Sequence, residues 1–503
     1  MLWKSNSSPG EHVRQQLRGA VRIEPNLPTG EQGTDPVCRV LQMFYTVRMS
    51  RVDDSGRIAN ADRSKLFLDF DSFFASAEQH FNPALRGKPV GVVPLDVPGT
   101  GCVAVSREAK ARGVPSSISI AKARAIVPDM IFVVARPDAY VRLHHRVLAT
   151  IERCVPVGKV GSIDELSCDL LPSEAAEAVA LAGRIKEALA QDFSPALTCS
   201  IGIAQTELLA KIASEMNKPD GLVVLDAGDL PGRIAHLALR DIPGVSEGVS
   251  ARLARAGIDT VRALWQMEAK QCRALWGNIE GERFWNALHG FPYNRPEHKK
   301  RMFGHSRMLP LDWRTPERVE DCARQLLLSA ARRLRRHGGR CRRMTLSARG
   351  GGYRSERRRK SDDKRWSAEV TFAPASDDRS LLRQLGGLAR RYASQIDFTP
   401  RSISVTLHGI EEQGQAQGDL LALCNRDAEI TRKRSEALSS TLDILRDRFG
   451  PSAASIGMHD AIPGGYLGAK IAFGRIPDLA DFNECATADG DTQFMRSIPA
   501  LTA

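Results

Sequence analysis

The chain is poor in several features that define whole classes of protein. Its ten cysteines are scattered through 503 residues without a CxxC pair, which argues for reduced thiols and against a disulfide framework or a zinc site. No apolar run approaches the roughly 18 residues that a membrane-spanning helix needs. Residues 1–20 lack the apolar core of a secretory signal. We therefore expect a soluble cytoplasmic protein without a membrane partner.

The charge of the chain is positive and unevenly distributed. Lys and Arg exceed Asp and Glu by 12 over the whole sequence. Residues 301–410 alone contain 25 basic and 11 acidic side chains, a net charge of +14, so the remaining residues carry a net charge of −2. A localised basic block of this kind predicts a polyanion-binding module attached to an ordinary globular body.

Composition and periodicity divide the chain into segments of different character. The length predicts about three to four domains, and the 42% of hydrophobic residues is enough for several cores. Alternating strands and helices with carboxylates at strand ends predict an α/β core. The predicted α+β multidomain organisation is a poorly ordered leader (1–64), the α/β core (65–225), an all-helical segment (226–292), a linker (293–300), a basic α+β module (301–410) and a C-terminal extension (411–503).

Local patterns also predict individual elements within these segments. A buried apolar run that ends in a carboxylate is typical of a strand, and apolar residues at helical spacing predict helices. The predictions used below are a strand at 65–71, helices at 72–79 and 175–190, strands at 342–349 and 401–407, a spacer at 411–418 and an amphipathic helix at 427–449.

Three carboxylates are the strongest candidates for chemistry. Asp69 ends the first predicted strand, and Asp164 and Glu165 enter another. If these strands are neighbours, the three acids converge at one edge of the sheet. Hard oxygen ligands suit Mg²⁺, and a pair of ions is a standard device for phosphoryl displacement. Taken alone, each acidic pair is more often a solvated surface feature, so the context decides.

Four motifs provide that context. They are the segments Asp69–Glu78, Asn82–Pro89, Ser162–Glu165 and Ala210–Gly221, in this order along the chain. Together they resemble the core of a Y-family translesion DNA polymerase, most like the DNA polymerase IV branch, and the looser similarity extends to about residue 411. The resemblance implies a right-hand polymerase with a palm (65–225), small fingers inserted at about 72–132, a helical thumb (226–292) and a little-finger domain (301–410).

The resemblance also implies roles for matched residues. Asp69, Asp164 and Glu165 would be catalytic and would bind two Mg²⁺ ions, with the backbone carbonyl of Phe70 as a further ligand. Phe74 matches the steric gate that excludes ribonucleotides. Asp71 is expected to support local structure, and the remaining expectations are core packing for Phe73, a triphosphate contact for Lys218 and a solvent-facing side chain for Lys211.

The fingers and the thumb depart from the family pattern. Where the family usually has Tyr and Arg three residues apart at the phosphates, this chain has Arg107 and Lys110. Both remain cationic nucleotide-binding candidates, but Lys110 lacks the bidentate geometry of arginine. In the thumb, Gly244, Val245 and Gly248 match a helix-hairpin-helix whose backbone N–H groups contact a DNA phosphate. A plain packing unit is the alternative there.

The basic module supplies the other predicted DNA contacts. Charge runs are often only solvated surface, but a net charge of +14 next to a polymerase core favours sequence-independent phosphate binding. The predicted DNA-binding side chains are Arg332, Arg333, Arg335, Arg336, Arg357, Arg358 and Arg359. Beyond the module, Gln417, Leu420, Leu421 and Leu423 resemble a degenerate sliding-clamp peptide, although short Leu-rich tails are also common by chance.

The function implied by the sequence is low-fidelity, template-directed DNA synthesis opposite damaged bases. Its partners would be primer–template DNA, deoxynucleoside triphosphates and a sliding clamp, and the protein is expected to be a monomer. The alternative is a non-catalytic Y-family paralogue that serves as a DNA- and clamp-binding scaffold for another polymerase. Such paralogues typically lose the metal carboxylates, whereas this chain keeps them.

Arg357, Arg358 and Arg359 lie in a predicted loop between two strands of the basic module, and charge reversal at all three tests whether this loop contacts DNA. Replacing all three with Glu removes cations that release counterions from DNA, so we expect weaker binding and a flatter dependence of log K on log salt concentration. Fluorescence anisotropy on labelled primer–template DNA at several salt concentrations measures both quantities. An unaltered slope would show that the loop points away from the DNA.

Overall fold

The computed structural model describes residues 63–94, 96, 99–292, 301–309, 311–350, 364–412 and 426–449, with the single residues 453, 454, 456 and 476. The described residues belong to one compact unit of the chain. No helix in these ranges is both long and apolar enough to cross a membrane.

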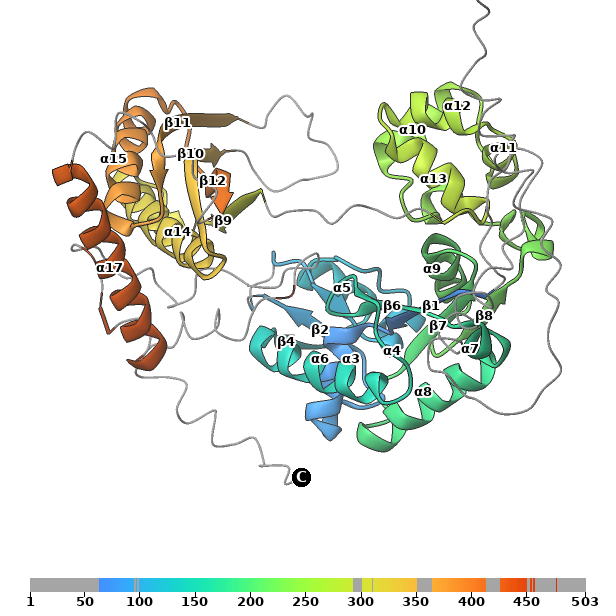
Figure 1. Ribbon diagram of the computed structural model, residues 1–503. Helices are drawn as coiled ribbons and strands as arrows, with labels where there is room; N and C mark the ends of the chain where they lie inside the picture. The colour runs from blue at the N-terminus through green and yellow to red at the C-terminus, as the bar shows by residue number, and fades with distance from the viewer. Residues whose placement is uncertain are drawn as a thin grey trace, which may run out of the picture. The chain divides into compact units, whose positions relative to one another are not determined.

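A five-stranded sheet forms the centre of residues 65–225 (Figure 1). β1 is hydrogen-bonded on both sides to antiparallel strands, as its almost entirely buried sequence requires. The predicted strand at 65–71 is thereby confirmed. The strand order is β5 (Lys159–Val160), β6 (Glu165–Asp169), β1 (Lys65–Phe70), β7 (Cys199–Ala204) and β8 (Leu222–Leu225).

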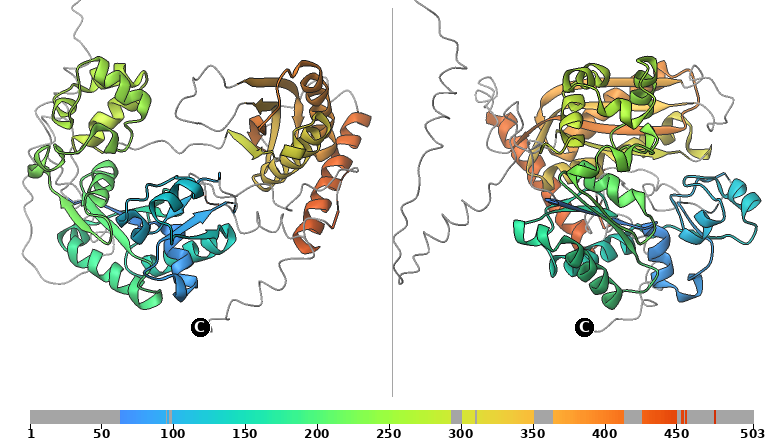
Figure 2. Two further views of the ribbon diagram at one scale, coloured as in Figure 1. Left: turned by 180° about the vertical axis from the view of Figure 1, so that it is seen from behind. Right: turned by 90° about the vertical axis from the view of Figure 1, so that its right-hand side faces the viewer.

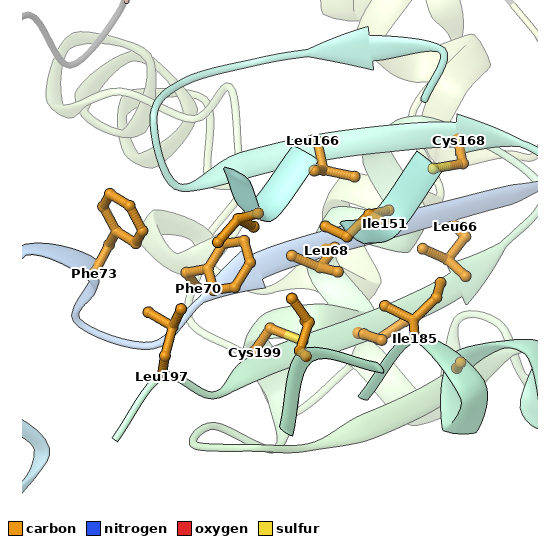
Figure 3. Close-up of a cluster of buried hydrophobic side chains, with 14 of the residues drawn as sticks. Leu66, Leu68, Phe70, Phe73, Ile151, Leu166, Cys168, Ile185, Leu197 and Cys199 are labelled. Atoms are coloured by element: carbon orange, nitrogen blue, oxygen red, sulfur yellow. The ribbon is translucent and has the colours of Figure 1, made fainter. Parts of the chain in front are cut away.

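Side chains of β1 alternate between two cores. Leu66, Leu68 and Phe70 point into a large apolar cluster, which also contains side chains of α6 (Pro137–Glu152) and α8 (Ala178–Asp192) (Figure 3). Phe67 packs on the opposite face, in the cluster that includes α9 (Glu207–Met216). Because successive side chains of a strand point to opposite faces, Asp69 must share the α9 face.

The close approach of α9 to the sheet depends on a glycine. A Cβ atom added at Gly202 in β7 would lie 1.9 Å from the carbonyl oxygen of Ala210 and 2.4 Å from the backbone nitrogen of Ser214. Only glycine therefore allows α9 to lie this close to β7. The predicted single helix at 175–190 is wrong in one respect, because two helices, α7 (Pro172–Ala176) and α8, are separated by Glu177.

A smaller three-stranded sheet follows the first strand in sequence. Its order is β3, β2, β4, and β2 pairs in parallel with β4. Val92 of β2 belongs to the same cluster as the core of the large sheet, so the two sheets share packing. The elements are α3 (Phe73–Phe81), β2 (Val90–Val93), β3 (Ala104–Val105), α4 (Arg107–Ala111), α5 (Ile120–Ile126) and β4 (Ile131–Val134).

Residues 226–292 are helical, as predicted, with short 3₁₀ turns before the first helix. Their apolar side chains join the cluster of α9, and the Thr206 hydroxyl donates to the Ala287 carbonyl at 2.7 Å. The four helices are α10 (Glu247–Arg255), α11 (Val261–Trp265), α12 (Ala269–Trp276) and α13 (Glu280–Leu288).

The basic module is a four-stranded antiparallel sheet with two helices on one face. The alternation of buried and exposed residues along its strands leaves the other face polar. The strand predicted at 342–349 begins earlier, at Gly339, and the strand predicted at 401–407 continues to Glu412, so β12 includes the first residues of the predicted spacer. The strand order is β11 (Arg365–Ala375), β10 (Gly339–Arg349), β12 (Ser402–Glu412) and β9 (Met302–Met308), and the helices are α14 (Pro316–Arg336) and α15 (Asp378–Gln395).

The predicted C-terminal helix is confirmed as α17 (Arg426–Phe449), and it packs on this module beside α15 (Figures 1 and 2). Polar contacts hold it there. Arg335 pairs with Asp443 of α17 at 2.7 Å and with Asp378, whose side chain is fully buried, at 2.6 Å. The Ser439 hydroxyl accepts a hydrogen bond from the Asp378 backbone N–H at 3.0 Å. The charged face of α17 is therefore part of the packing of the module.

Removing the Arg335 cation should destabilise this module. Arg335→Met leaves the buried Asp378 carboxylate without its nearest cation, and breaking such a pair costs about 3 kcal/mol or more of unfolding free energy. Thermal unfolding of the full chain, followed by circular dichroism, should show a lower midpoint. Arg336→Met is the matched control. The exposed Arg336 also forms an ion pair, at 3.3 Å, but its partner Asp447 is itself exposed. Equal midpoints for the two variants would contradict the structural role of Arg335.

Candidate functional site

Three predicted carboxylates meet at one end of the large sheet. Glu165, the first residue of β6, lies directly opposite Asp69 of β1 in the antiparallel register. The Asp164 carbonyl accepts a hydrogen bond from the Phe70 N–H at 2.8 Å, which fixes the entry into β6 beside the end of β1. The antiparallel pairing of β1 with β6 thus brings together acids that are about a hundred residues apart in the sequence.

Two lysines from the α9 side contact these acids. Lys218 Nζ lies 2.6 Å from Asp69 Oδ1 and 2.7 Å from Glu215 Oε1. Lys211 Nζ lies 2.5 Å from Glu165 Oε1. The expectation that Lys211 faces solvent is wrong, because the close packing of α9 on the sheet places its ammonium at Glu165. Lys211 lies within the Ala210–Gly221 motif, but nothing in that motif indicated this contact.

Burial changes the acidity of the site. Burial raises the pKa of Asp69 to about 7, although the neighbouring Lys218 cation acts in the opposite direction. Burial also raises the pKa of Asp164, against the effect of a hydrogen bond from the Ser162 hydroxyl. Desolvated carboxylates that lie together are stabilised by cations. The site therefore combines anionic oxygen donors with an environment that favours binding of positive charge.

The donor set fits a hard divalent cation. Asp69, Asp164 and Glu165 offer only carboxylate oxygens, the ligands that Mg²⁺ prefers. Within the described ranges, no three Asp, Glu, His or Cys side chains already lie close enough together to form a metal cage. Lysines hold two of the three carboxylates instead, so occupancy by a cation requires these ion pairs to rearrange.

Asp71 is a structural hub, which agrees with its predicted supporting role. Its carboxylate accepts hydrogen bonds from the hydroxyl groups of Thr198 and Ser200 and from the backbone N–H of Asp220, each at 2.8 Å. Only 3% of Asp71 is exposed. Both carboxylate oxygens accept hydrogen bonds, so Asp71 joins the end of β1 to the start of β7 and to the segment that follows α9.

Phe74 is buried in an aromatic and ionic cluster. Its ring stacks on that of Tyr140 with centroids 4.8 Å apart. The Tyr140 hydroxyl donates to the buried carboxylate of Glu78 at 2.6 Å, and Arg136 pairs with the same carboxylate. Phe73 is buried in the core, as expected. The Phe74 ring is thus held by Tyr140, which is itself fixed by Glu78. The role of Phe74 as a steric gate stays a prediction.

The two cations at the start of α4 differ in their surroundings. Arg107 donates through Nη1 to the Thr198 hydroxyl at 3.0 Å and through Nη2 to the Ala196 carbonyl at 3.4 Å. Lys110, one turn later on α4, is exposed. Only Lys110 is therefore presented to solvent as a simple cationic contact.

The predicted hairpin at the start of α10 has the backbone that its sequence requires. Gly244 has φ +95°, a left-handed conformation that favours glycine. The Ser246 side chain caps α10 by accepting from the Val249 N–H. Val245 is buried, and its N–H donates to the Ile242 carbonyl at 3.0 Å, so that group already has a partner. Contacts of Gly244 and Gly248 with a phosphate stay predictions.

The expectation of DNA contacts is not supported at Arg332 and Arg335. Their side chains are only 3% and 9% exposed and pair with carboxylates of α17, which sequence reasoning did not connect with these arginines. Arg336 also pairs with α17, and Arg333 donates to the Gly304 carbonyl at 2.9 Å. Arg357, Arg358 and Arg359 lie outside the described residues, as do Gln417, Leu420, Leu421 and Leu423.

Comparison with known proteins connects this geometry with a family. The impB/mucB/samB family matches residues 68–215, and the C-terminal domain of that family matches residues 300–420. A relative named DNA polymerase IV from Halorhodospira halophila is 31% identical over 366 residues, which cover 72% of this chain and 99% of the relative. A relative named DNA polymerase IV 2 from Mesorhizobium japonicum is 31% identical over 408 residues, covering 78% of this chain and 93% of the relative.

One solved structure gives the corresponding likeness in fold. A Y-family DNA polymerase chimera superposes with a TM-score of 0.58 at 22% sequence identity, covering 69% of this chain and 99% of that one. At this level of identity the match supports the arrangement of helices and strands. The first family match contains Asp69, Asp164 and Glu165, and the second contains the whole of the basic module (301–410).

Proposed function

This chain belongs to the Y-family DNA polymerases, in the DNA polymerase IV branch, and we propose that it performs template-directed DNA synthesis across damaged bases by a two-metal nucleotidyl transfer. The observation that carries the proposal is the meeting of Asp69, Asp164 and Glu165 at one end of the central sheet, within the family match. The protein is a DNA-directed DNA polymerase, and its low fidelity follows from the same membership.

The described bodies correspond to the parts of a right-hand polymerase. We assign the palm to residues 65–225, the fingers to about 72–132 within it, the thumb to 226–292 and the little finger to 301–410. The elements that support this division are the five-stranded sheet, the small three-stranded sheet, the four-helix segment and the four-stranded basic module. The packing of α17 on the module extends the structural unit of the little finger to residue 449.

The residues of the site divide the work of the reaction between them. Asp69, Asp164 and Glu165 would hold two Mg²⁺ ions, with the Phe70 carbonyl as a further ligand. Bound there, Mg²⁺ supplies charge neutralisation for the triphosphate and for the developing charge on the leaving group. Lys218 can exchange its Asp69 partner for a phosphate oxygen, because both are anionic oxygen acceptors.

Other residues recognise the sugar, the phosphates and the duplex. Phe74 would lie under the sugar and exclude a 2′-hydroxyl, with Tyr140 stacked behind it. Lys110 would contact the triphosphate from α4. The polar face of the basic sheet and residues 351–363 would contact the DNA backbone. We further propose a sliding clamp as partner for residues 417–423, a monomeric state and a cytoplasmic location.

Primer extension with purified protein tests the proposed function. Asp164→Ala/Glu165→Ala should reduce extension at least about a thousandfold, because several kcal/mol of charge stabilisation is lost. Glu152→Ala is the matched control, since Glu152 is an exposed acid at the end of α6. DNA binding should persist in both variants. Equally little extension by wild type and the double variant, with DNA binding intact, would instead favour the scaffold alternative.

The gate assignment has its own test. Phe74→Ala should lower the ratio of kcat/KM for deoxy- over ribonucleotides by at least about tenfold, because the ring that excludes the 2′-hydroxyl is gone. Phe73→Ala is a matched control that loses a similar aromatic ring from the same core. Steady-state insertion of both nucleotide types measures the ratio. Unchanged sugar selectivity in Phe74→Ala would refute the assignment.

A further inference from the structure

Arg107 connects the fingers to the palm in a way that its position in the motif does not predict. It is the first residue of α4, yet its guanidinium reaches the loop that precedes β7. Nη1 donates to Thr198 Oγ1 at 3.0 Å, and Nη2 donates to the Ala196 carbonyl at 3.4 Å. The donors at the end of the side chain are therefore directed at the palm.

Thr198 extends this hydrogen-bonded contact from Arg107 to the interior of the palm. Leu197 and Cys199, on either side of it, point into the apolar core (Figure 3), so the alternation of the chain turns Thr198 away from that core. Its hydroxyl accepts from Arg107 and donates to Asp71 Oδ2 at 2.8 Å. A hydroxyl that accepts on one side and donates on the other has a fixed orientation.

Asp71 then links the hydrogen bonds of Arg107 and Thr198 to the segments that carry Asp69 and Lys218. It lies two positions after Asp69 and accepts the backbone N–H of Asp220, which lies two positions after Lys218. The Asp71 backbone N–H also donates to the Thr198 carbonyl at 3.0 Å. The position of α4 is thereby tied to the segments that carry Asp69 and Lys218.

We propose that Arg107, Thr198 and Asp71 form a strut that fixes α4 against the palm, and that these three are positioning residues. The strut holds Lys110 of α4 at a set place relative to Lys218, so that both cations meet the triphosphate of one nucleotide. This inference rests on the proposed function, because it assigns a role in nucleotide binding to the same site.

The surroundings of the guanidinium favour a strut over a direct phosphate contact. Arg107 Nε is buried and has no hydrogen-bond partner among the described residues, and the other two nitrogens donate to palm acceptors. A phosphate on Arg107 would have to displace Thr198 or Ala196. α4 has only five residues, so its orientation depends on such attachments. Pre-organising a contact in this way lowers the entropy that substrate binding must offset.

A double-mutant cycle tests the strut with conservative changes. Arg107→Met removes the donors and keeps most of the side-chain volume, and Thr198→Val removes only the hydroxyl. Arg112→Met is the matched control, because Arg112 directly follows α4 and pairs with the exposed Asp129. The single variants, the double variant and the control are compared in the full chain by steady-state insertion and by amide hydrogen exchange without nucleotide.

The strut predicts a particular pattern. Each single variant should raise the KM for the deoxynucleotide about fivefold with kcat changed less than about twofold, and the double variant should match a single one, because both changes break the same connection. Exchange of amides in residues 104–114 should become faster to the same extent in all three. The control should leave both quantities unchanged.

Two results would overturn the inference. If Arg107 binds phosphate directly, Thr198→Val stays near wild type, and the fold-changes of the singles multiply in the double variant. Unchanged exchange in residues 104–114 would show that the strut does not fix α4. A wild-type protein that extends no primer would refute the proposed function instead, while the exchange measurement would still decide the strut.

Discussion

The alternation of side chains along β1 is the constraint on which the rest of the site depends. Leu66, Leu68 and Phe70 occupy one core, so Asp69 has to face α9. Pairing with β6 then places Glu165 opposite it, and Asp164 follows from the same register. A shift of β1 by one residue would bury the acid in the apolar core. The fold of the palm and the chemistry of its carboxylates are thus set by one strand.

Charge is balanced locally, although the chain as a whole is basic. Lys218 pairs with the buried Asp69 and Lys211 with the half-buried Glu165, so both cations lie beside oxygen ligands that also suit a divalent cation. In the basic module, Asp443 and Asp447 of α17 form ion pairs with arginines at the end of α14. The positive charge left for a polyanion is therefore smaller, and differently placed, than the net charge of residues 301–410 implies.

Sequence patterns predicted the local elements and the acids well, because strands and helices of strong periodicity depend mainly on nearby residues. The strand predicted at 65–71 and the helix predicted at 427–449 are examples, found as β1 and α17. Contacts between segments that are distant in the chain have no comparable pattern in the sequence. The ion pair of Lys211 with Glu165 depends on the packing of α9 at Gly202, and that of Arg335 with Asp443 depends on a helix more than a hundred residues away.

The proposed function depends above all on the binding of divalent cations by the carboxylates at the ends of β1 and β6. Titration of Mn²⁺ into the full chain with primer–template DNA, followed by the electron paramagnetic resonance signal of free Mn²⁺, measures this directly. We expect wild type to bind Mn²⁺ and Asp69→Asn to bind it at least about tenfold more weakly, because a ligand oxygen and its charge are removed. Equal Mn²⁺ binding by the two proteins would contradict it.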